Sequence, residues 1–205
     1  MQVKVSLELK DRNGNVKERR EFYSKSWVKN YIKTWCADIT GWTVKIYDKN
    51  GNLVDYHGYI TESYTKECPS SVGCYECIKQ KVRSANVGGS DSAGILIGTG
   101  DTPWDKDQYC LANQITGDVV THGNMEVEDG TEGEVEPYVR LKRTFTNNSG
   151  SDITINEVGL FFNYYLLTTT ETNYSYMVIR DVLETPMTLS SGGTITIKYE
   201  IFIIY

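Results

Sequence analysis

The sequence lacks a long apolar run. No segment approaches the roughly 18 to 20 consecutive apolar residues that a membrane-spanning helix requires. The first residues, MQVKVSLELKD, alternate in polarity and contain no apolar stretch of signal-peptide length. We therefore expect a chain that is synthesised in the cytoplasm, has no N-terminal export signal and does not enter a membrane.

Positive charge is also scarce, because 21 lysines and arginines stand against 27 aspartates and glutamates, a formal net charge of -6 at pH 7. A protein that binds the phosphate backbone of nucleic acids needs a field of the opposite sign. The basic stretch from Lys17 to Lys33 is typical of the solvated face of a strand and a helix. Nucleic acid is therefore not an expected partner.

Histidine and the usual catalytic motifs are nearly absent. The only histidines, His57 and His122, each precede a glycine, which predicts exposed turns. There is no HExxH, GxSxG or GK[ST] motif. Without a motif that combines a nucleophile, a base or a metal, we expect no enzymatic activity and no cofactor.

The residues that are present favour strands. Fifteen tyrosines accompany many β-branched residues, and apolar side chains alternate along most segments. Asn13-Gly14 and Asn50-Gly51 each stand between two alternating runs, which predicts two β-hairpins. Between the hairpins, Trp27, Tyr31, Ile32 and Trp35 have the spacing of an amphipathic helix, which Ser24 or Ser26 would cap.

From Gly94 to the end, about six strand-like segments alternate with turns rich in Gly, Asn and Ser. This pattern predicts a mainly β protein, a β-sandwich of jelly-roll type with one short N-terminal amphipathic helix. The length suits a single domain over residues 1–205. Residues 61–92 show little periodicity and are expected to form an irregular, cysteine-bearing excursion.

The segment ILIGTGDTPWDKDQY, residues 95–109, resembles a phosphate-binding loop in having Gly98-x-Gly100 after an apolar strand. No third glycine follows at the required spacing, and no helix is predicted to begin there. We instead expect the glycines to adopt positive φ angles at a strand end. Asp101, Asp105 and Asp107 lack the spacing of a calcium loop and are predicted to form turns.

The cysteines leave several chemistries open. Cys74 and Cys77 have the spacing of a zinc knuckle, Cys68 lies near them, and Cys36 and Cys110 stand elsewhere. Only half of a zinc signature is present, so a fourth ligand would come from Cys36, His57 or Cys110. Structural disulfides are the leading alternative, free thiols remain open as well, and the presence of a metal is unknown.

Several other residues are candidates for contacts rather than chemistry. The glutamates from Glu126 to Glu136 fall on even-numbered positions, which predicts a solvated strand edge. Trp42 and Trp104 are candidate stacking platforms for a sugar, although the favoured interpretation of Trp104 is a side chain packed beside the glycine corner. Apolar residues in excess of one core predict subunit contacts through the following side chains: Phe161, Phe162, Tyr164, Tyr165, Phe202, Ile203, Ile204 and Tyr205.

Four strings in this order resemble a widespread set of structural proteins of tailed bacteriophages and related archaeal viruses. They are SKSWVKNYIKTW, GILIGTGDTPWDKDQYCL, RLKRTFTNNSGSDITINEVGLFF and MVIRDVLETPMTLSSGGTITIKYEI. The resemblance covers most of the chain except residues 61–92. It implies a β-sandwich virion protein, such as a head decoration, capsid-vertex, neck or tail component. The implied partners are other copies of the chain and other virion proteins. A host-surface glycan is a separate candidate ligand, for which Trp42 and Trp104 are the stacking candidates.

Overall fold

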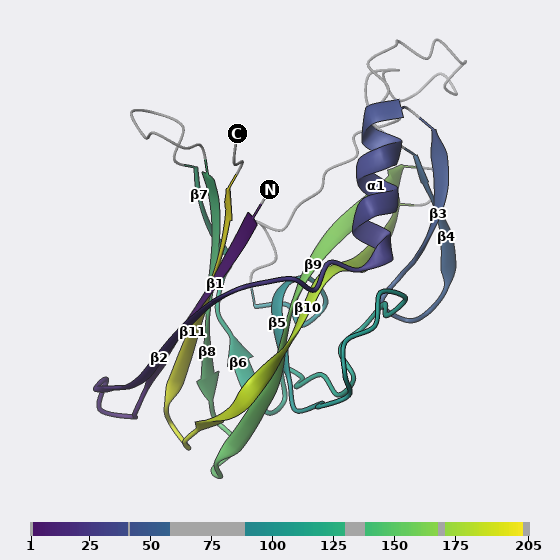
Figure 1. Cartoon of the computed structure of the whole chain (residues 1–205). Helices are drawn as coiled ribbons and strands as arrows, with labels where there is room; N and C mark the ends of the chain where they lie inside the picture. Colours follow the sequence, from purple (N-terminus) through teal and green to yellow (C-terminus); the bar gives the residue numbers. More distant parts are fainter. Residues whose placement is uncertain (1, 41, 58–88, 130–137, 168–170, 203–205) are drawn as a thin grey trace.

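The computed structural model (Figure 1) describes the chain except for residues 1, 41, 58–88, 130–137, 168–170 and 203–205. The described part forms one helix, α1 (Lys29–Thr40), and antiparallel strands. The strands are β1 (Gln2–Lys10), β2 (Val16–Tyr23), β3 (Thr43–Tyr47), β4 (Leu53–His57), β5 (Gly94–Gly98), β6 (Val120–His122), β7 (Glu126–Asp129), β8 (Tyr138–Asn147), β9 (Ile153–Leu167), β10 (Glu171–Leu189) and β11 (Thr194–Phe202). The prediction of a mainly β chain with one helix is confirmed. No helix in this part has the length and apolarity needed to cross a membrane.

The larger sheet, sheet A, has the strand order β2-β1-β11-β8-β6, and β7 also pairs with β8. The first and last strands lie side by side in its centre, in register from Gln2 opposite Phe202 to Lys10 opposite Thr194. Sheet B has the order β10-β9-β5, and a third pair, β3 with β4, forms a separate small sheet. All of these pairings are antiparallel.

Both hairpins predicted from Asn-Gly pairs are confirmed. Gly14 joins β1 to β2 with φ of 83°, and Gly51 joins β3 to β4 with φ of 81°. In each hairpin an aspartate at the start of the turn accepts hydrogen bonds from backbone amides that follow it. Asp11 bonds Asn13 and Asn15 in this way, and Asp48 bonds Asn50 and Asn52. Both turns therefore have a positive φ at glycine and a local acceptor that fixes the loop.

The helix is present, but its predicted buried face is only partly right, because Trp27 and Tyr31 pack against the core whereas Ile32 and Trp35 do not. Ile32 and Trp35 are about half exposed, and Trp27 precedes α1 in a β-bridge to Ile179. The helix instead buries Asn30, Thr34 and Ala37. Figure 1 shows α1 between the β3–β4 hairpin and the ends of β9 and β10. The small residues let α1 approach this hairpin closely.

The predicted helix caps are also wrong. Ser24 donates a hydrogen bond to Asp181, and its Oγ accepts one from the Ser26 amide. Both serines precede the first helical residue, Lys29, by at least three positions. The Lys29 amide is instead satisfied by the carbonyl of Lys106, so a distant loop closes the start of the helix.

The hydrophobic core lies between sheets A and B. Along β1, Val3, Val5, Leu7 and Leu9 point inward, and Ile195, Ile197 and Tyr199 of β11 continue the same face. One connected cluster joins these residues to side chains from β5, β9 and β10 and to Ala37 of α1. Fully burying one such aliphatic side chain stabilises a fold by about 1.5 to 3 kcal/mol. The inward positions that carry charge instead of apolar atoms are therefore exceptional, and they define the candidate site.

Candidate functional site

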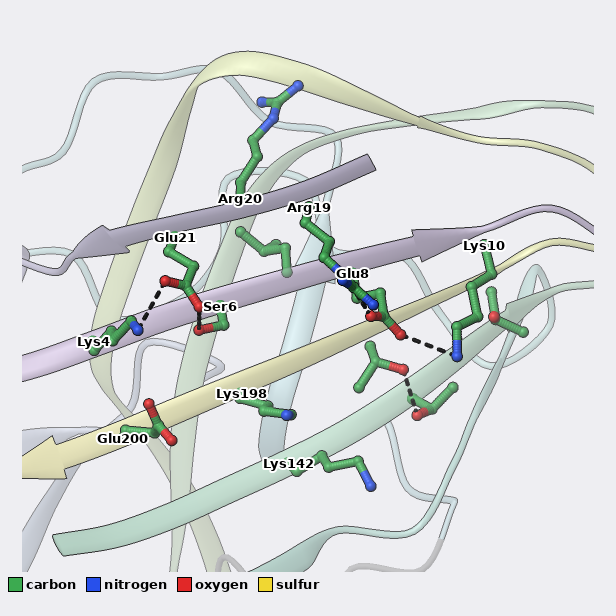
Figure 2. Close-up of a pocket in the computed structure, with 14 residues that line it drawn as sticks. Lys4, Ser6, Glu8, Lys10, Arg19, Arg20, Glu21, Lys142, Lys198 and Glu200 are labelled. Carbon is green, nitrogen blue, oxygen red and sulfur yellow. Dashed lines mark hydrogen bonds and ion pairs between the residues drawn. The ribbon is translucent and has the colours of Figure 1, made fainter. Parts of the chain in front are cut away.

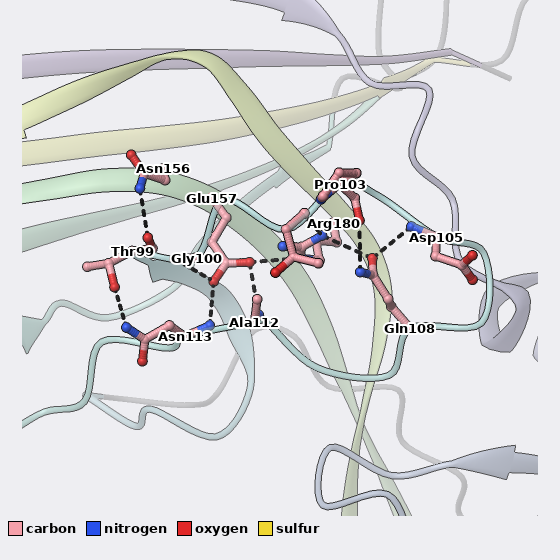
Figure 3. Close-up of polar contacts among 11 residues, drawn as sticks. Thr99, Gly100, Pro103, Asp105, Gln108, Ala112, Asn113, Asn156, Glu157 and Arg180 are labelled. Atoms are coloured by element: carbon pink, nitrogen blue, oxygen red, sulfur yellow. Dashed lines mark hydrogen bonds and ion pairs between the residues drawn. The ribbon is translucent and has the colours of Figure 1, made fainter.

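Three segments that are distant in sequence meet at a buried ion pair (Figure 3). Glu157 lies on β9, Arg180 lies on β10, and residues 99–113, here called the 99–113 loop, wrap around both side chains. The Arg180 Nε donates to Glu157 Oε2 at 2.7 Å, and both side chains have 0% exposure. Glu157 and Arg180 lie in the segments NEVGL and IRDVL, which are parts of two of the strings quoted above.

The Glu157 carboxylate is fully engaged inside the chain. Besides Arg180, it accepts hydrogen bonds from the backbone amides of Gly100 at 3.2 Å, Ala112 at 3.0 Å and Asn113 at 2.8 Å. Charge-assisted bonds of this kind are roughly twice as strong as neutral ones. The carboxylate thus clamps the two ends of the 99–113 loop together.

Arg180 holds the middle of the same loop. Its Nη1 donates to the carbonyl of Thr102 at 2.9 Å and to Gln108 Oε1 at 3.0 Å. Gln108 in turn donates to the carbonyl of Pro103 and accepts from the amide of Asp105. Figure 3 shows these contacts as a continuous chain from Glu157 to Asp105. We call the set formed by Glu157, Arg180 and the loop groups they bond the Glu157–Arg180 node.

The glycines of ILIGTG leave space for this node, and the expectation of positive φ angles for them is wrong. Neither Gly98 nor Gly100 has a positive φ. A Cβ at Gly98 would collide with the Glu157 carboxylate and stand 2.6 Å from the carbonyl oxygen of Asn113. A Cβ at Gly100 would stand 2.5 Å from Ala112 Cβ and 2.6 Å from Glu157 Oε1. The glycines are required by close approach of the loop to a buried carboxylate.

The aspartate next to Arg180 faces another environment. Asp181 accepts a hydrogen bond from Ser24 Oγ at 2.8 Å and one from the hydroxyl of Tyr199 at 3.4 Å. Burial raises the pKa of Asp181 to about 6, although the bonds from Ser24, Ser26 and Tyr199 oppose this shift. The same desolvation raises the pKa of Tyr199 well above its ordinary value. Asp181 therefore links β10 to the β2–α1 connection and to sheet A.

A second charged interior group lies on β8. Arg143 is fully buried and donates to the carbonyls of Gly123, Ala93, Ile95 and Ser90. Desolvation lowers the pKa of this guanidinium to about 10, and nearby Asp91 opposes the shift. Arg143 thereby holds the segment leading into β5 against β8.

His122 is a correction to the sequence prediction of an exposed turn. Its side chain is only 3% exposed, packs edge-on against Phe145 and lies near Arg143. Burial, followed by the charge of Arg143, lowers the pKa of His122. Neither ring nitrogen has a hydrogen-bond partner among the described residues. The other histidine, His57, belongs to strand β4 rather than to a turn.

The outer face of sheet A carries a polar groove of about 780 Å³ (Figure 2). The basic residues lining it are Lys4, Lys10, Arg19, Arg20, Lys142 and Lys198. The acidic ones are Glu8, Glu21 and Glu200, and hydroxyl groups come from Ser6, Thr144, Thr194 and Thr196. Figure 2 shows Glu21 directed to Lys4 and Glu8 directed to Arg19 and Lys10. Several of these charges are therefore paired across neighbouring strands.

The structure separates the cysteine candidates. Cys36 is exposed on α1, Cys110 is half-buried in the 99–113 loop, and both are free thiols. Desolvation raises the pKa of Cys110, and the nearby Glu157 adds to the shift. Cys68, Cys74 and Cys77 lie outside the described residues. Within the described part, no group of three or more His, Cys, Asp or Glu side chains is arranged to hold a metal ion.

The two candidate tryptophans and the acidic residues expected in turns or at a strand edge are exposed. Trp42 is 72% exposed beside the end of α1, and Trp104 is 41% exposed in the 99–113 loop. Asp105 accepts a hydrogen bond from the Asp107 amide at 2.8 Å, as expected of a turn former. Glu126 and Glu128 line one face of β7 and pair with Lys142 and Arg140. The solvated edge is thus confirmed for these two glutamates, and the later ones lie outside the described residues.

The interface candidates divide between core and surface. Phe161 has 0% exposure, so the prediction that it contacts another subunit is wrong. Phe162 is half-buried against the core, and Phe202 is half-buried at the end of β11. Tyr164 and Tyr165 lie in β9, but their side chains are not described. Ile203, Ile204 and Tyr205 lie outside the described residues.

Sequence reasoning missed the node and Arg143, although a signal for them exists. Glu157 continues the alternating positions of Ile153 and Ile155 on β9, and Arg143 stands between Leu141 and Phe145 on β8. A charged residue at an apolar position of an alternating strand predicts a buried charge with internal partners.

Comparisons of the chain with models of protein families, with curated proteins and with solved structures found no significant match.

Proposed function

We propose that this chain is a non-enzymatic structural component of a tailed virus particle, namely a capsid decoration, vertex, neck or tail protein. In this proposal it assembles in the virion through repeated contacts with other copies of itself and with other virion proteins. It needs no cofactor and binds neither nucleic acid nor membrane. Its scaffold would be a β-sandwich of jelly-roll type.

The Glu157–Arg180 node is the observation that carries this proposal. The strings that resemble virion proteins place Gly98 and Gly100, Glu157 and Arg180 in one cluster, where they hold a loop. The ion pair is fully buried and its carboxylate is occupied by backbone amides. A general acid or base must reach its substrate, and these side chains cannot. The shared residues therefore suit a rigid building block better than a catalytic site.

The arrangement of the sheets supports the finer fold proposal. Sheets A and B contribute to one hydrophobic cluster, and the chain passes from β8 of sheet A to the β9–β10 pair of sheet B and back to β11 of sheet A. Two antiparallel sheets that share a core are the architecture of a sandwich. Such a scaffold leaves the outer sheet faces and the loops free for contacts between subunits.

The test is the protein composition of purified particles. Virions from a culture carrying this gene would be isolated on a density gradient and digested for quantitative mass spectrometry. The proposal predicts peptides of this chain in the particle band at a copy number comparable with other repeated subunits. Peptides found only in the lysate, at the level of soluble contaminants, would contradict it.

A carbohydrate- or receptor-binding module displayed on the particle is the second candidate. The exposed Trp104, on a loop held in place by the node, is the observation that favours it, because an exposed indole can stack on a sugar ring. A glycan array would test the wild type, Trp104→Ala and, as a control indole elsewhere, Trp42→Ala. Binding lost only in Trp104→Ala supports this role, and absence of binding by the wild type rejects it.

A further inference from the structure

The centre of the groove on sheet A holds two like charges. Lys198 of β11 and Lys142 of β8 are directly opposite in the strand register, and both line the groove. Like charges in this position destabilise a sheet. Lys142 is compensated by Glu126, whereas Lys198 has no ion pair with a described carboxylate. This placement favours an anionic group bound from outside.

Neighbouring groups suit a carboxylate. Ser6 lies beside Lys198 on β1, and the hydroxyls of Thr144 and Thr196 are 2.9 Å apart one step along the same strands. Hydroxyls and ammonium groups donate hydrogen bonds to oxyanions. No aromatic side chain lines the groove to stack on a neutral sugar. The lining therefore favours an acidic peptide over a neutral glycan.

The distribution of charge along the chain indicates which acidic peptide suits the groove. Six basic and three acidic residues give the groove a net charge of +3, whereas the whole chain carries -6, so the remainder carries -9. Asp129, Glu132, Glu134 and Glu136 lie within eight residues of sequence. The three glutamates occupy alternate positions, the spacing that places side chains on one face of an extended segment. Together with Glu126 and Glu128, these residues form the densest acidic stretch of the chain.

We propose that the groove on sheet A binds the acidic segment Asp129–Glu136 of a second copy of this chain. The contact joins two different surfaces, so it either closes reciprocally in a two-fold dimer or propagates head-to-tail to a ring or a filament. It gives the repeated subunit contact a location, and for its biological role it rests on the proposed function. Charge pairing of this kind sets register and association rate, and salt weakens it.

Sedimentation velocity of the full chain tests this contact. We expect self-association at about 0.05 M salt and an apparent dissociation constant at least ~10-fold higher at about 0.5 M salt. A groove variant, Lys142→Glu with Lys198→Glu, and a segment variant, Glu132→Lys with Glu134→Lys and Glu136→Lys, each lose association. The matched control for the groove variant, Lys25→Glu with Lys106→Glu, makes the same change of charge at positions outside the groove and keeps association. Circular dichroism verifies that each variant is folded.

Mixing the two variants gives the sharpest result. Each alone presents like charges on both surfaces, but together the reversed groove meets the reversed segment, so the equimolar mixture regains association. A monomeric wild type, including one whose segment binds its own groove, would overturn the proposal. Self-association that persists in the groove variant would also overturn the proposal, even if that variant no longer bound an anionic polysaccharide. A salt-independent monomer found in virions would reject this contact and leave the proposed function standing.

Discussion

At the scale of single residues, the chain is distinguished by charge placed where apolar atoms are usual. Glu157, Arg180, Arg143 and Asp181 are buried, and each bonds segments that are remote in sequence. Burying an ion pair is weakly favourable at best, but removing one partner leaves an uncompensated charge. These residues therefore define which loop conformation is allowed more than they add to net stability.

Neutralising Glu157 tests this statement. Glu157→Gln leaves the Arg180 guanidinium buried without its counter-charge, and we expect the free energy of unfolding to fall by about 3 to 5 kcal/mol. Glu126→Gln, which breaks an exposed ion pair with Lys142, should cost no more than about 1 kcal/mol. Urea titration of both variants measures the difference. Equal costs for the two substitutions would show that the node does not hold the loop.

Adding one methyl group tests the space around the same carboxylate. In Gly98→Ala the new Cβ meets Glu157 and the Asn113 carbonyl, so we expect destabilisation of about 1 to 3 kcal/mol. Gly117→Ala is the matched control, because no atom lies within 4 Å of its Cβ and its φ is not positive. There the loss of unfolded-chain entropy predicts a change of about 0.4 to 1 kcal/mol in the stabilising direction. Thermal melts compare the pair, and similar melting temperatures would contradict this account.

Asp181 predicts a pH dependence. Its pKa is about 6 in the folded chain against 3.8 ordinarily, so ionisation is easier in the unfolded chain. The stability associated with the neutral form is complete below pH 3.8 and is lost as the pH rises to about 6. This shift of the Asp181 pKa corresponds to a change of about 3 kcal/mol in the free energy of unfolding.

Asp181→Asn removes this titration and should be more stable than the wild type at pH 7. At pH 3.5, a value on the order of the ordinary aspartate pKa, the two should be nearly equal. Chemical denaturation across this range measures the gap, with the exposed Asp118→Asn as the control. A gap that is constant with pH, or that widens toward acid, would refute the assignment.

At the scale of elements, the sequence predicted what depends on neighbouring residues. Asn-Gly pairs identified both hairpins, because positive φ at glycine is a local requirement. The alternation of β1 identified its inward face. The face of α1 was not predictable in this way, because its contact partner is 17 residues away. The Asn30 side chain donates to the Tyr47 carbonyl at 2.8 Å and accepts from the Tyr47 amide at 3.1 Å.

The buried face of α1 gives a prediction for this element. Ala37 is fully buried, so Ala37→Leu overpacks the contact and should cost about 1 to 3 kcal/mol. Ile39 is 66% exposed, and Ile39→Ala should change stability by no more than about 0.5 kcal/mol. Guanidinium unfolding of the two variants compares the stability lost by a change on the buried face of α1 with that lost by a change on its exposed face. A larger loss from Ile39→Ala than from Ala37→Leu would contradict this assignment of the buried face.

The candidate site was predictable only in part. Charged residues at inward strand positions identify Glu157 and Arg143 as buried, and the glycines of ILIGTG mark a close approach. The pairing of Glu157 with Arg180 depends on the register of β9 and β10, where Arg180 lies opposite Gly159. That register, and the return of residues 99–113 to the same place, are set by tertiary packing and are not encoded in any short pattern.

At the scale of the whole molecule, the first and last strands pair in the centre of sheet A, and the 99–113 loop closes onto sheet B. This arrangement leaves the polar face of sheet A outside the hydrophobic core, where the groove lies. A rigid scaffold whose charged face takes no part in the hydrophobic core is suited to building a larger assembly. The proposed virion role and the proposed contact between copies both use this face.

The most direct measurement is a cryo-electron microscopy map of the particle from the virus that carries this gene. We predict repeated density, in a ring or array of the head, neck or tail, into which sheets A and B fit with the groove of sheet A at a subunit boundary. A complete map in which every repeated density is assigned to other chains would contradict the account.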